Sequence, residues 1–247
     1  MARQESFLKL KGRVGDLTFY KSGGKYLART KGGIDGDRIK NDPRFARTRE
    51  NGQEFLRAVK AGKLLRDAFR EQLTLTSDRG MSGRLSSAFS KIVKSDEVSA
   101  RGERNVMAGD VALLTGFEFN ANSNLKNIFT EGYGASLAEG VAEVLIDAFN
   151  PSSIRKPEGA THGQFVIVAG FFDFNGLESA AATVEGEPFS LDESEHLEET
   201  LTVGSVEPIE GGIGVVMLGL LFWQEVNGEL YKLNNGSTNA LRVIAVE

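Results

Sequence analysis

The chain has 247 residues, of which 40% are hydrophobic, and a formal net charge of −5 at pH 7. It contains no cysteine, which excludes disulfides, thiolate metal sites and cysteine nucleophiles. The apolar share argues against a wholly disordered chain. Charge is unevenly distributed, because residues 1–105 carry 24 Lys and Arg against 13 Asp and Glu, whereas residues 106–247 carry 5 against 21. We expect a basic region at 1–105 and an acidic domain at 106–247, and such a sign change predicts an interaction.

The first segment alternates between polar and apolar residues like a β-hairpin. Short runs around Phe19 and Tyr26 flank the turn Ser22-Gly23-Gly24, and basic residues are interleaved with them, which predicts one basic and one apolar face. Because two or three strands are marginally stable alone, the apolar face must rest on another surface. The candidate interaction surface of this basic arm comprises Lys9, Lys11, Arg13, Phe19, Tyr20, Lys21, Lys25, Tyr26, Arg29 and Lys31.

Two amphipathic helices are predicted after the hairpin. Asp42-Pro43 is typical of a helix start, and apolar residues then recur at spacings of three and four up to about Leu73, with Asn51-Gly52 as a candidate break. A second helix is predicted over residues 82–94, where Leu85 and Phe89 lie on one face. Residues 95–110 are polar and predict a connector.

From about residue 111 the pattern changes to short strand-like runs. The fold class that we predict is therefore α+β: an N-terminal β-hairpin and two amphipathic helices followed by an antiparallel β-sandwich. The apolar runs at residues 164–174 and 213–223 predict central strands that are covered on both faces, and Asn227-Gly228 predicts a tight hairpin turn. The predicted strands are residues 112–119, 141–149, 164–174, 180–184, 197–203, 213–226, 229–233 and 240–246.

The sequence offers little material for catalysis or for metal binding. Only His162 and His196 are present, and the Glu193-to-His196 spacing lies in an acidic stretch that we interpret as a solvated loop and strand edge. From this stretch we take Glu193, Glu195, Glu198 and Glu199 as the acidic part of the candidate interaction surface. Glycine-rich and serine-containing segments lack the residues that a phosphate loop, a dinucleotide fingerprint or a nucleophile elbow requires. We therefore expect no enzyme activity, no catalytic residue, no metal and no cofactor.

The N-terminal residues and the longest apolar run indicate where in the cell the protein is expected. The first seven residues contain no apolar signal-peptide core, and the 11-residue run at 213–223 is short of the ~20 residues that a membrane helix needs. We expect synthesis in the cytoplasm without a signal peptide, no membrane span, and release, if any, within an assembled particle or filament.

Three segments carry a resemblance to known sequences. They are KGRVGDLTFYKSGGKYLAR at residues 11–29, FWQEVNGELY at residues 222–231, and Asn239-Ala240-Leu241. In these segments the chain resembles an uncharacterised family of Bacteroidota proteins with no assigned activity. The resemblance implies a non-enzymatic protein and transfers no site residue.

Three classes of function remain open from the sequence, and the last of them is an enzyme with an unrecognised pair of carboxylates. The first is a self-associating structural protein, a subunit of a filament, tube or virus-like assembly, whose basic arm docks on the acidic domain of a neighbour. The second is a binding module that takes nucleic acid through the basic half or glycan through the sandwich. Glycan binding needs an exposed aromatic platform, and Trp223 lies in a run that we expect to be buried.

Overall fold

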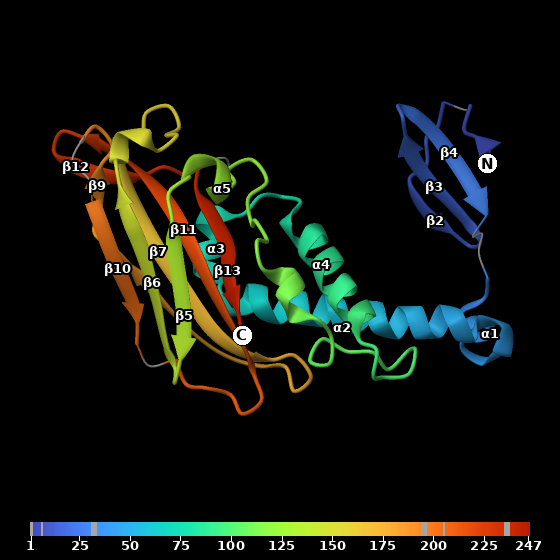
Figure 1. Ribbon diagram of the computed structural model, residues 1–247. Helices are drawn as coiled ribbons and strands as arrows, with labels where there is room; N and C mark the ends of the chain where they lie inside the picture. Colours follow the sequence, from blue (N-terminus) through green and yellow to red (C-terminus); the bar gives the residue numbers. More distant parts are fainter. Residues whose placement is uncertain (1, 6, 31–33, 194–196, 205, 235–237) are drawn as a thin grey trace. The chain divides into compact units, whose positions relative to one another are not determined.

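The structure is a computed structural model that describes residues 2–5, 7–30, 34–193, 197–204, 206–234 and 238–247 (Figure 1). It contains both helices and antiparallel sheets, which confirms the mixed α+β class. The chain forms two compact units, Met1–Arg49 and Glu50–Glu247.

The N-terminal unit is built around a four-stranded antiparallel sheet with the order β1-β4-β3-β2. Gly23 and Gly24, with φ of 55° and 77°, form the turn between the two long strands, a conformation that glycine adopts at low cost. No described residue of this unit is buried. Its elements are β1 (Ala2–Arg3), β2 (Gly12–Val14), β3 (Leu17–Ser22), β4 (Lys25–Thr30), α1 (Gly36–Asn41) and the 3-10 helix η1 (Pro43–Phe45).

Three helices follow: α2 (Ala46–Ala68), α3 (Arg70–Thr76) and α4 (Met81–Ser95). Asp42 and Pro43 begin η1, directly ahead of α2. The helix runs unbroken through Asn51-Gly52, so the candidate break at that pair is wrong. It ends instead at Phe69, whose φ of −113° leaves the helical range.

The remainder of the second unit forms two antiparallel sheets. A six-stranded sheet has β11 and β7 at its centre, paired from Ile213 opposite Phe172 to Trp223 opposite His162. A three-stranded sheet has the order β10-β6-β5. The strands are β5 (Tyr133–Ala138), β6 (Val141–Phe149), β7 (His162–Asp173), β8 (Glu178–Glu185), β9 (Phe189–Ser190), β10 (Leu197–Val203), β11 (Ile213–Val226), β12 (Glu229–Lys232) and β13 (Ala240–Val246).

One face of the six-stranded sheet packs against the helices. Along β7 the residues Val166, Val168 and Phe172 point into this core, because alternate side chains of a strand share a face. Phe69 and Phe89 reach the sheet from the helices, and the ring of Phe69 lies 5.4 Å from that of Phe172 in an edge-to-face contact. Figure 1 shows helices α2 to α4 on this side of the sheet.

The intervening residues of the central strands face a second core. Phe165, Ile167 and Leu218 lie there with Val144 and Ile146 of β6, so the two sheets share one apolar cluster. The central runs are thus covered on both faces, as their unbroken hydrophobicity predicts. The two clusters stabilise the second unit as one body that includes its helices.

Several local predictions differ from the structure. Residues 112–119 form no strand. Val111–Leu114 is the 3-10 helix η2, which the side chain of Asp110 caps by accepting a hydrogen bond from the Ala112 N–H at 3.1 Å. Strand β5 was not predicted, since its two alanines, its serine and its glycine have weak strand preference. The short helices α5 (Leu125–Ile128) and η3 (Pro151–Ser153) complete the chain.

The division by contacts falls at residues 49 and 50, whereas the charge changes sign near residue 105. The reason is that α2 to α4 carry basic residues on their outer faces and apolar residues on their inner faces. Leu65, Leu85 and Phe89 are fully buried against the sheet, so the helices share its core although their surface charge resembles that of the N-terminal sheet. The Asn227-Gly228 turn is confirmed: with φ of 55° and 84°, these residues close the β11–β12 hairpin.

Candidate interaction surfaces

The register of the N-terminal sheet divides its side chains between two faces. Residues directly opposite each other on antiparallel strands share a face. Val14 lies opposite Leu17, and Phe19 lies opposite Ala28, so these residues gather on one side. Val14 is 65% exposed and Leu17 is 42% exposed. This face, called the apolar face below, comprises Ala2, Val14, Leu17, Phe19, Lys21, Tyr26, Ala28 and Thr30.

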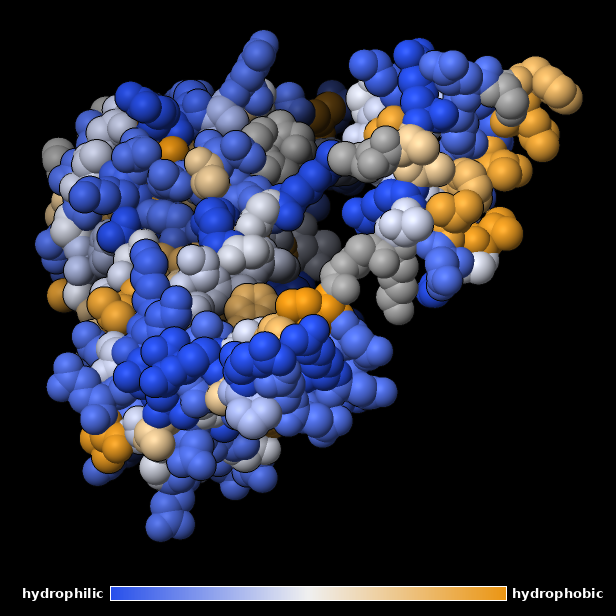
Figure 2. All heavy atoms as spheres, turned by 90° about the vertical axis from the view of Figure 1, so that its right-hand side faces the viewer, coloured by the Kyte–Doolittle hydropathy of each residue, from blue (hydrophilic) through white to orange (hydrophobic). Residues whose placement is uncertain are grey.

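The opposite side of the same sheet is basic. Arg13, Thr18 and Arg29 form one row across it, and Tyr20, Leu27 and Arg3 form the next. The guanidinium of Arg29 lies 5.4 Å from the centre of the Tyr20 ring, a cation–π contact. This face, called the basic face below, comprises Arg3, Arg13, Thr18, Tyr20, Ser22, Lys25, Leu27 and Arg29. In Figure 2 hydrophobic side chains gather along one side of the N-terminal unit, and hydrophilic side chains gather elsewhere on it.

The predicted basic arm is therefore distributed over several places. Arg13, Tyr20, Lys25 and Arg29 lie on the basic face. Phe19 and Tyr26 lie on the apolar face together with Lys21, whose ammonium is 5.4 Å from the centre of the Tyr26 ring. Lys9 and Lys11 belong to the segment before β2, where the Lys9 ammonium donates a hydrogen bond to the Gln4 carbonyl at 2.6 Å. Lys31 is outside the described residues.

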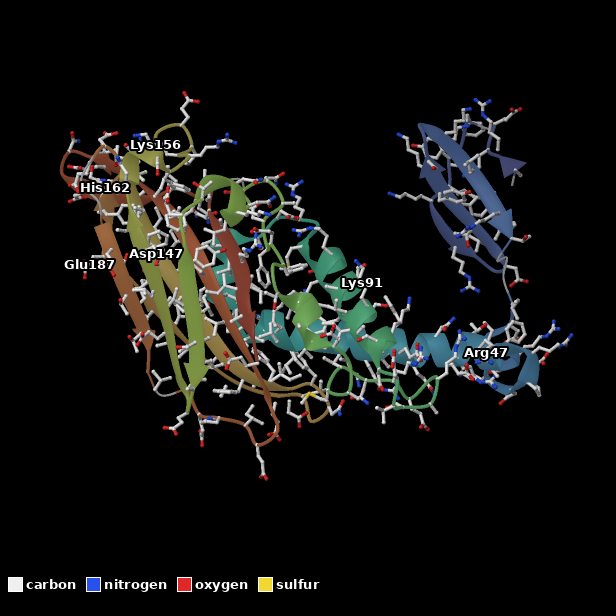
Figure 3. The ribbon with its side chains drawn as sticks, in the orientation of Figure 1. Arg47, Lys91, Asp147, Lys156, His162 and Glu187 are labelled. Atoms are coloured by element: carbon white, nitrogen blue, oxygen red, sulfur yellow. The ribbon has the colours of Figure 1, made fainter. Side chains whose placement is uncertain are left out.

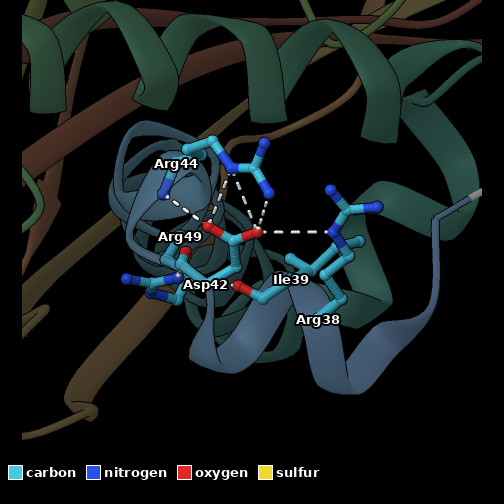
Figure 4. A network of polar contacts seen from close by, with 5 residues as sticks. All are labelled: Arg38, Ile39, Asp42, Arg44 and Arg49. Carbon is cyan, nitrogen blue, oxygen red and sulfur yellow. Dashed lines mark hydrogen bonds and ion pairs between the residues drawn. The ribbon is translucent and has the colours of Figure 1, made fainter.

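A second group of basic side chains surrounds Asp42 (Figure 4). Arg44 Nη2 lies 2.9 Å from Asp42 Oδ2, and Arg38 Nε lies 3.3 Å from the same oxygen. The side-chain hydrogen bond from Arg44 lowers the pKa of Asp42, and the backbone N–H of Arg44 adds to the effect. Arg49 donates to the carbonyls of Ile39 and Asp42 at 2.7 and 3.0 Å. These arginines hold the segment before α2 together, and Asp42 compensates part of their charge.

The outer face of the three-stranded sheet is acidic. From Val141 to Asp147, strand β6 alternates between exposed and buried residues, and the exposed ones in this stretch are Val141, Glu143, Leu145 and Asp147. Glu198 of β10 is exposed on the same side, where the register shifts between Leu197 and Glu199 and leaves Glu198 opposite Asp147 and Ala148. The other outward positions hold small or hydroxyl residues: Gly134, Ser136, Ala138, Thr200 and Thr202. Figure 3 shows Asp147 on β6. We call this surface the acidic face.

Of the acidic stretch predicted from sequence, only Glu198 lies on the acidic face. Glu199 pairs with Ile146 and is half-buried on the inner side, where burial raises the pKa of its carboxyl group and the nearby charge of Glu187 raises it further. Glu193 is exposed in the turn after β9. Glu195 is outside the described residues.

Sequence reasoning missed Glu143 and Asp147 as surface residues. The sequence does contain a pattern that indicates their exposure, because Glu143 and Asp147 alternate with apolar residues along one strand. Neighbours of Glu143 and Asp147 across the sheet come from β10, about fifty residues further along the chain. The pairing of β6 with β10 is set by the tertiary fold, and no pattern of neighbouring residues in the sequence predicts it.

Trp223 is more exposed than its apolar run predicts. It lies at the end of the β7 pairing, is half-buried, and has the ammonium of Lys232 4.9 Å from its ring centre. Its indole N–H donates a hydrogen bond to Gln164 Oε1 at 3.0 Å, which holds one edge of the ring toward the protein. Lys232 covers the ring, so Trp223 offers no open platform for a sugar.

Groups that could perform chemistry are sparse in the described part of the chain. No three His, Asp or Glu side chains converge there as metal ligands would. His162 Nε2 lies 3.9 Å from Glu225 Oε2, and its Nδ1 lies 2.9 Å from the Thr161 hydroxyl. Lys156, nearby along the chain, pairs with Asp192 at 2.5 Å. These contacts join neighbouring strands and loops and converge on no deep cavity.

Comparisons of the chain with protein-family models, with curated proteins and with solved structures find no match. Across the described residues, no helix combines the length and the apolar character that crossing a membrane requires. The basic, apolar and acidic faces are therefore the candidate functional surfaces of the protein.

Proposed function

We propose that this is a non-enzymatic, self-associating structural protein, a subunit of a filament, tube or virus-like assembly. The observation that carries the proposal is the N-terminal sheet, in which no described residue is buried. Covering the apolar face of such a sheet with another surface removes apolar side chains from water, and exposed apolar patches are typical of association sites.

The distribution of charge supports a contact between copies. Residues 1–49 carry 13 Lys and Arg against 5 Asp and Glu, a net charge of +8, while residues 50–247 carry 16 against 29, a net charge of −13. Docking of the N-terminal unit of one copy on the second unit of the next is a heterologous contact. Such a contact repeats into a ring when the rotation closes and into a filament when it does not.

We also infer that the two sheets of the second unit form the antiparallel β-sandwich that the sequence predicts. The apolar cluster shared by Val144, Ile146, Phe165 and Leu218 supports this arrangement. In the proposed assembly the sandwich is the rigid body, and the N-terminal sheet is the connecting arm.

Sedimentation velocity over a range of protein concentration tests the proposal. We expect the full chain to form oligomers at low salt and to dissociate as salt rises, since the Debye length falls from ~30 Å at 0.01 M to ~3 Å at 1 M. A chain that lacks residues 1–31 is expected to stay monomeric. A full chain that is monomeric at high concentration and low salt would contradict the proposal.

The basic face also supports a second candidate function, binding of nucleic acid. Arg13, Lys25 and Arg29 surround Tyr20 as phosphate-binding and base-stacking side chains do on single-strand-binding surfaces. This function predicts that affinity for an oligonucleotide falls steeply as salt rises. Absence of binding to single-stranded or double-stranded DNA and RNA at low salt would remove it.

A further inference from the structure

We propose that the acidic face is the surface on which the basic face of a second copy docks. This inference rests on the proposed function and adds to it the two faces that meet. The acidic face is the outer side of β10, β6 and β5, and its partner is the side of the N-terminal sheet that carries Arg3, Arg13, Lys25 and Arg29.

Each face combines an apolar pair with side chains of one charge, and the charges of the two faces are opposite. On the acidic face the apolar pair Val141 and Leu145 lies along β6, with Glu143 between them and Asp147 beyond. On the basic face, Tyr20 and Leu27 lie directly opposite each other and form the apolar centre. Four basic side chains, Arg3, Arg13, Lys25 and Arg29, stand around that centre. An apolar centre with a charged rim is the usual anatomy of a protein interface.

The acidic face is open and its charges are uncompensated. Val141 is 40% exposed and Leu145 is 41% exposed, a large fraction for residues in the central strand of a sheet. Among the described residues, no Lys or Arg lies within ion-pair distance of Glu143, Asp147 or Glu198. The register of β10 shifts between Leu197 and Glu199, so Glu198 lies opposite Asp147 and Ala148 and adds a second negative charge to this end of the face. A basic partner would compensate these charges.

The basic face is uncompensated in the same way. Within the described part of the chain, Arg3, Arg13, Lys25 and Arg29 have no carboxylate partner, in contrast to Arg38 and Arg44, which share Asp42. Arg13 donates to the carbonyl of Gly15 at 3.1 Å, which leaves the rest of its guanidinium free for a partner. Four positive charges can therefore meet three negative ones in a sheet-on-sheet contact, whose usual spacing is ~10 Å.

A second copy is favoured over nucleic acid as the partner of the basic face. A phosphate backbone would match the charge of Arg13 and Arg29 but makes no use of Leu27, which stands at the centre of the face. The acidic face offers both the charge and an exposed apolar pair, Val141 and Leu145. Electrostatic complementarity of this kind sets register and orientation as well as affinity.

Charge reversal in the full chain tests the inference. The variant Arg13→Glu with Arg29→Glu disables the basic face, and Glu143→Arg with Asp147→Arg disables the acidic face. We expect either variant to raise the concentration needed for association by at least tenfold. Glu158→Arg with Glu178→Arg is the matched control, because both residues are exposed and lie outside the acidic face. The control is expected to associate like the wild type.

Two further measurements identify the contact. In an equal mixture of the two variants the native faces complement each other, and so do the two reversed faces, so the mixture is expected to recover association that neither variant shows alone. A chain that carries all four reversals is expected to recover association. Circular dichroism of each variant verifies that it folds, and Glu143→Gln with Asp147→Asn, which removes charge without reversing it, provides a milder acidic-face variant.

The outcomes separate the two proposals. Normal association of the folded acidic-face variants, together with monomers on deletion of residues 1–31, would overturn this inference and leave the proposed function standing. A monomeric wild type would overturn both. Loss of oligonucleotide binding in Arg13→Glu with Arg29→Glu, with association unchanged, would assign the basic face to nucleic acid instead.

Discussion

Glu199 is a half-buried acidic residue whose ionisation destabilises the folded state. Its carboxylate lies so close to Gly186 that a Cβ atom at that glycine would stand 2.1 Å from Oε1. Burial raises the pKa of Glu199, with the charge of Glu187 as a second cause. The folded state therefore binds the Glu199 proton more tightly than the unfolded state does, and it is destabilised when this group ionises.

The contribution of Glu199 to the free energy of unfolding depends on pH. Glu199 contributes most favourably below the unfolded pKa near 4.5, and this contribution is lost as pH rises through the higher folded pKa. We expect Glu199→Gln to raise the melting temperature at pH 7 and to leave it nearly unchanged at pH 3, as measured by thermal denaturation at both values. Glu158→Gln, at an exposed position outside the acidic face, is the control and should change little at either pH. A lower melting temperature of Glu199→Gln at pH 7 would contradict this account.

Among the elements, helix α4 shows how a segment with a basic surface is held in the core of the second unit. Phe89 is fully buried, and its ring lies 5.2 Å from that of Phe174, just beyond the end of β7. The helix belongs to the basic part of the sequence, yet its apolar face is bound to the acidic part. This contact is the physical reason why the charge boundary and the contact boundary do not coincide.

We expect Phe89→Ala to destabilise the whole second unit by about 3–5 kcal/mol. Helical circular dichroism and the fluorescence of Trp223 should then shift together in one denaturant transition, because helix and sheet share a core. Lys91→Ala, at an exposed position of the same helix, should stay within about 0.5 kcal/mol of the wild type. Separate transitions for the two signals would show that helix and sheet unfold independently.

At the scale of the whole molecule, the two units differ in how they are stabilised. The second unit contains both apolar clusters, while the N-terminal unit contains no buried described residue. We expect deletion of residues 1–31 to leave the main thermal transition unchanged, measured by calorimetry at high salt, where association is suppressed. Loss of more than a few degrees would show that the second unit depends on the N-terminal sheet for its own stability.

Much of the local structure follows from periodicity alone. Apolar residues at spacings of three and four predicted α4, and the unbroken runs around Val168 and Met217 predicted central strands. These patterns are local because the side chains that face a core recur with the period of the helix or strand that carries them. The turn at Asn227-Gly228 follows from the backbone preference of two adjacent residues. Strand β5 escaped prediction because small residues carry a weak local signal.

Most of the strands, helix α4, the segregation of charge and the alternation of basic and apolar residues in the first strands can be predicted from the sequence. Only the tertiary structure decided which residues share a surface. It separated Lys21 from Arg13 and Arg29, turned Glu199 inward, and placed Glu198 opposite Asp147 and Ala148. The physical reason is that faces are set by strand pairing between distant segments and by burial in shared cores, which no local pattern specifies.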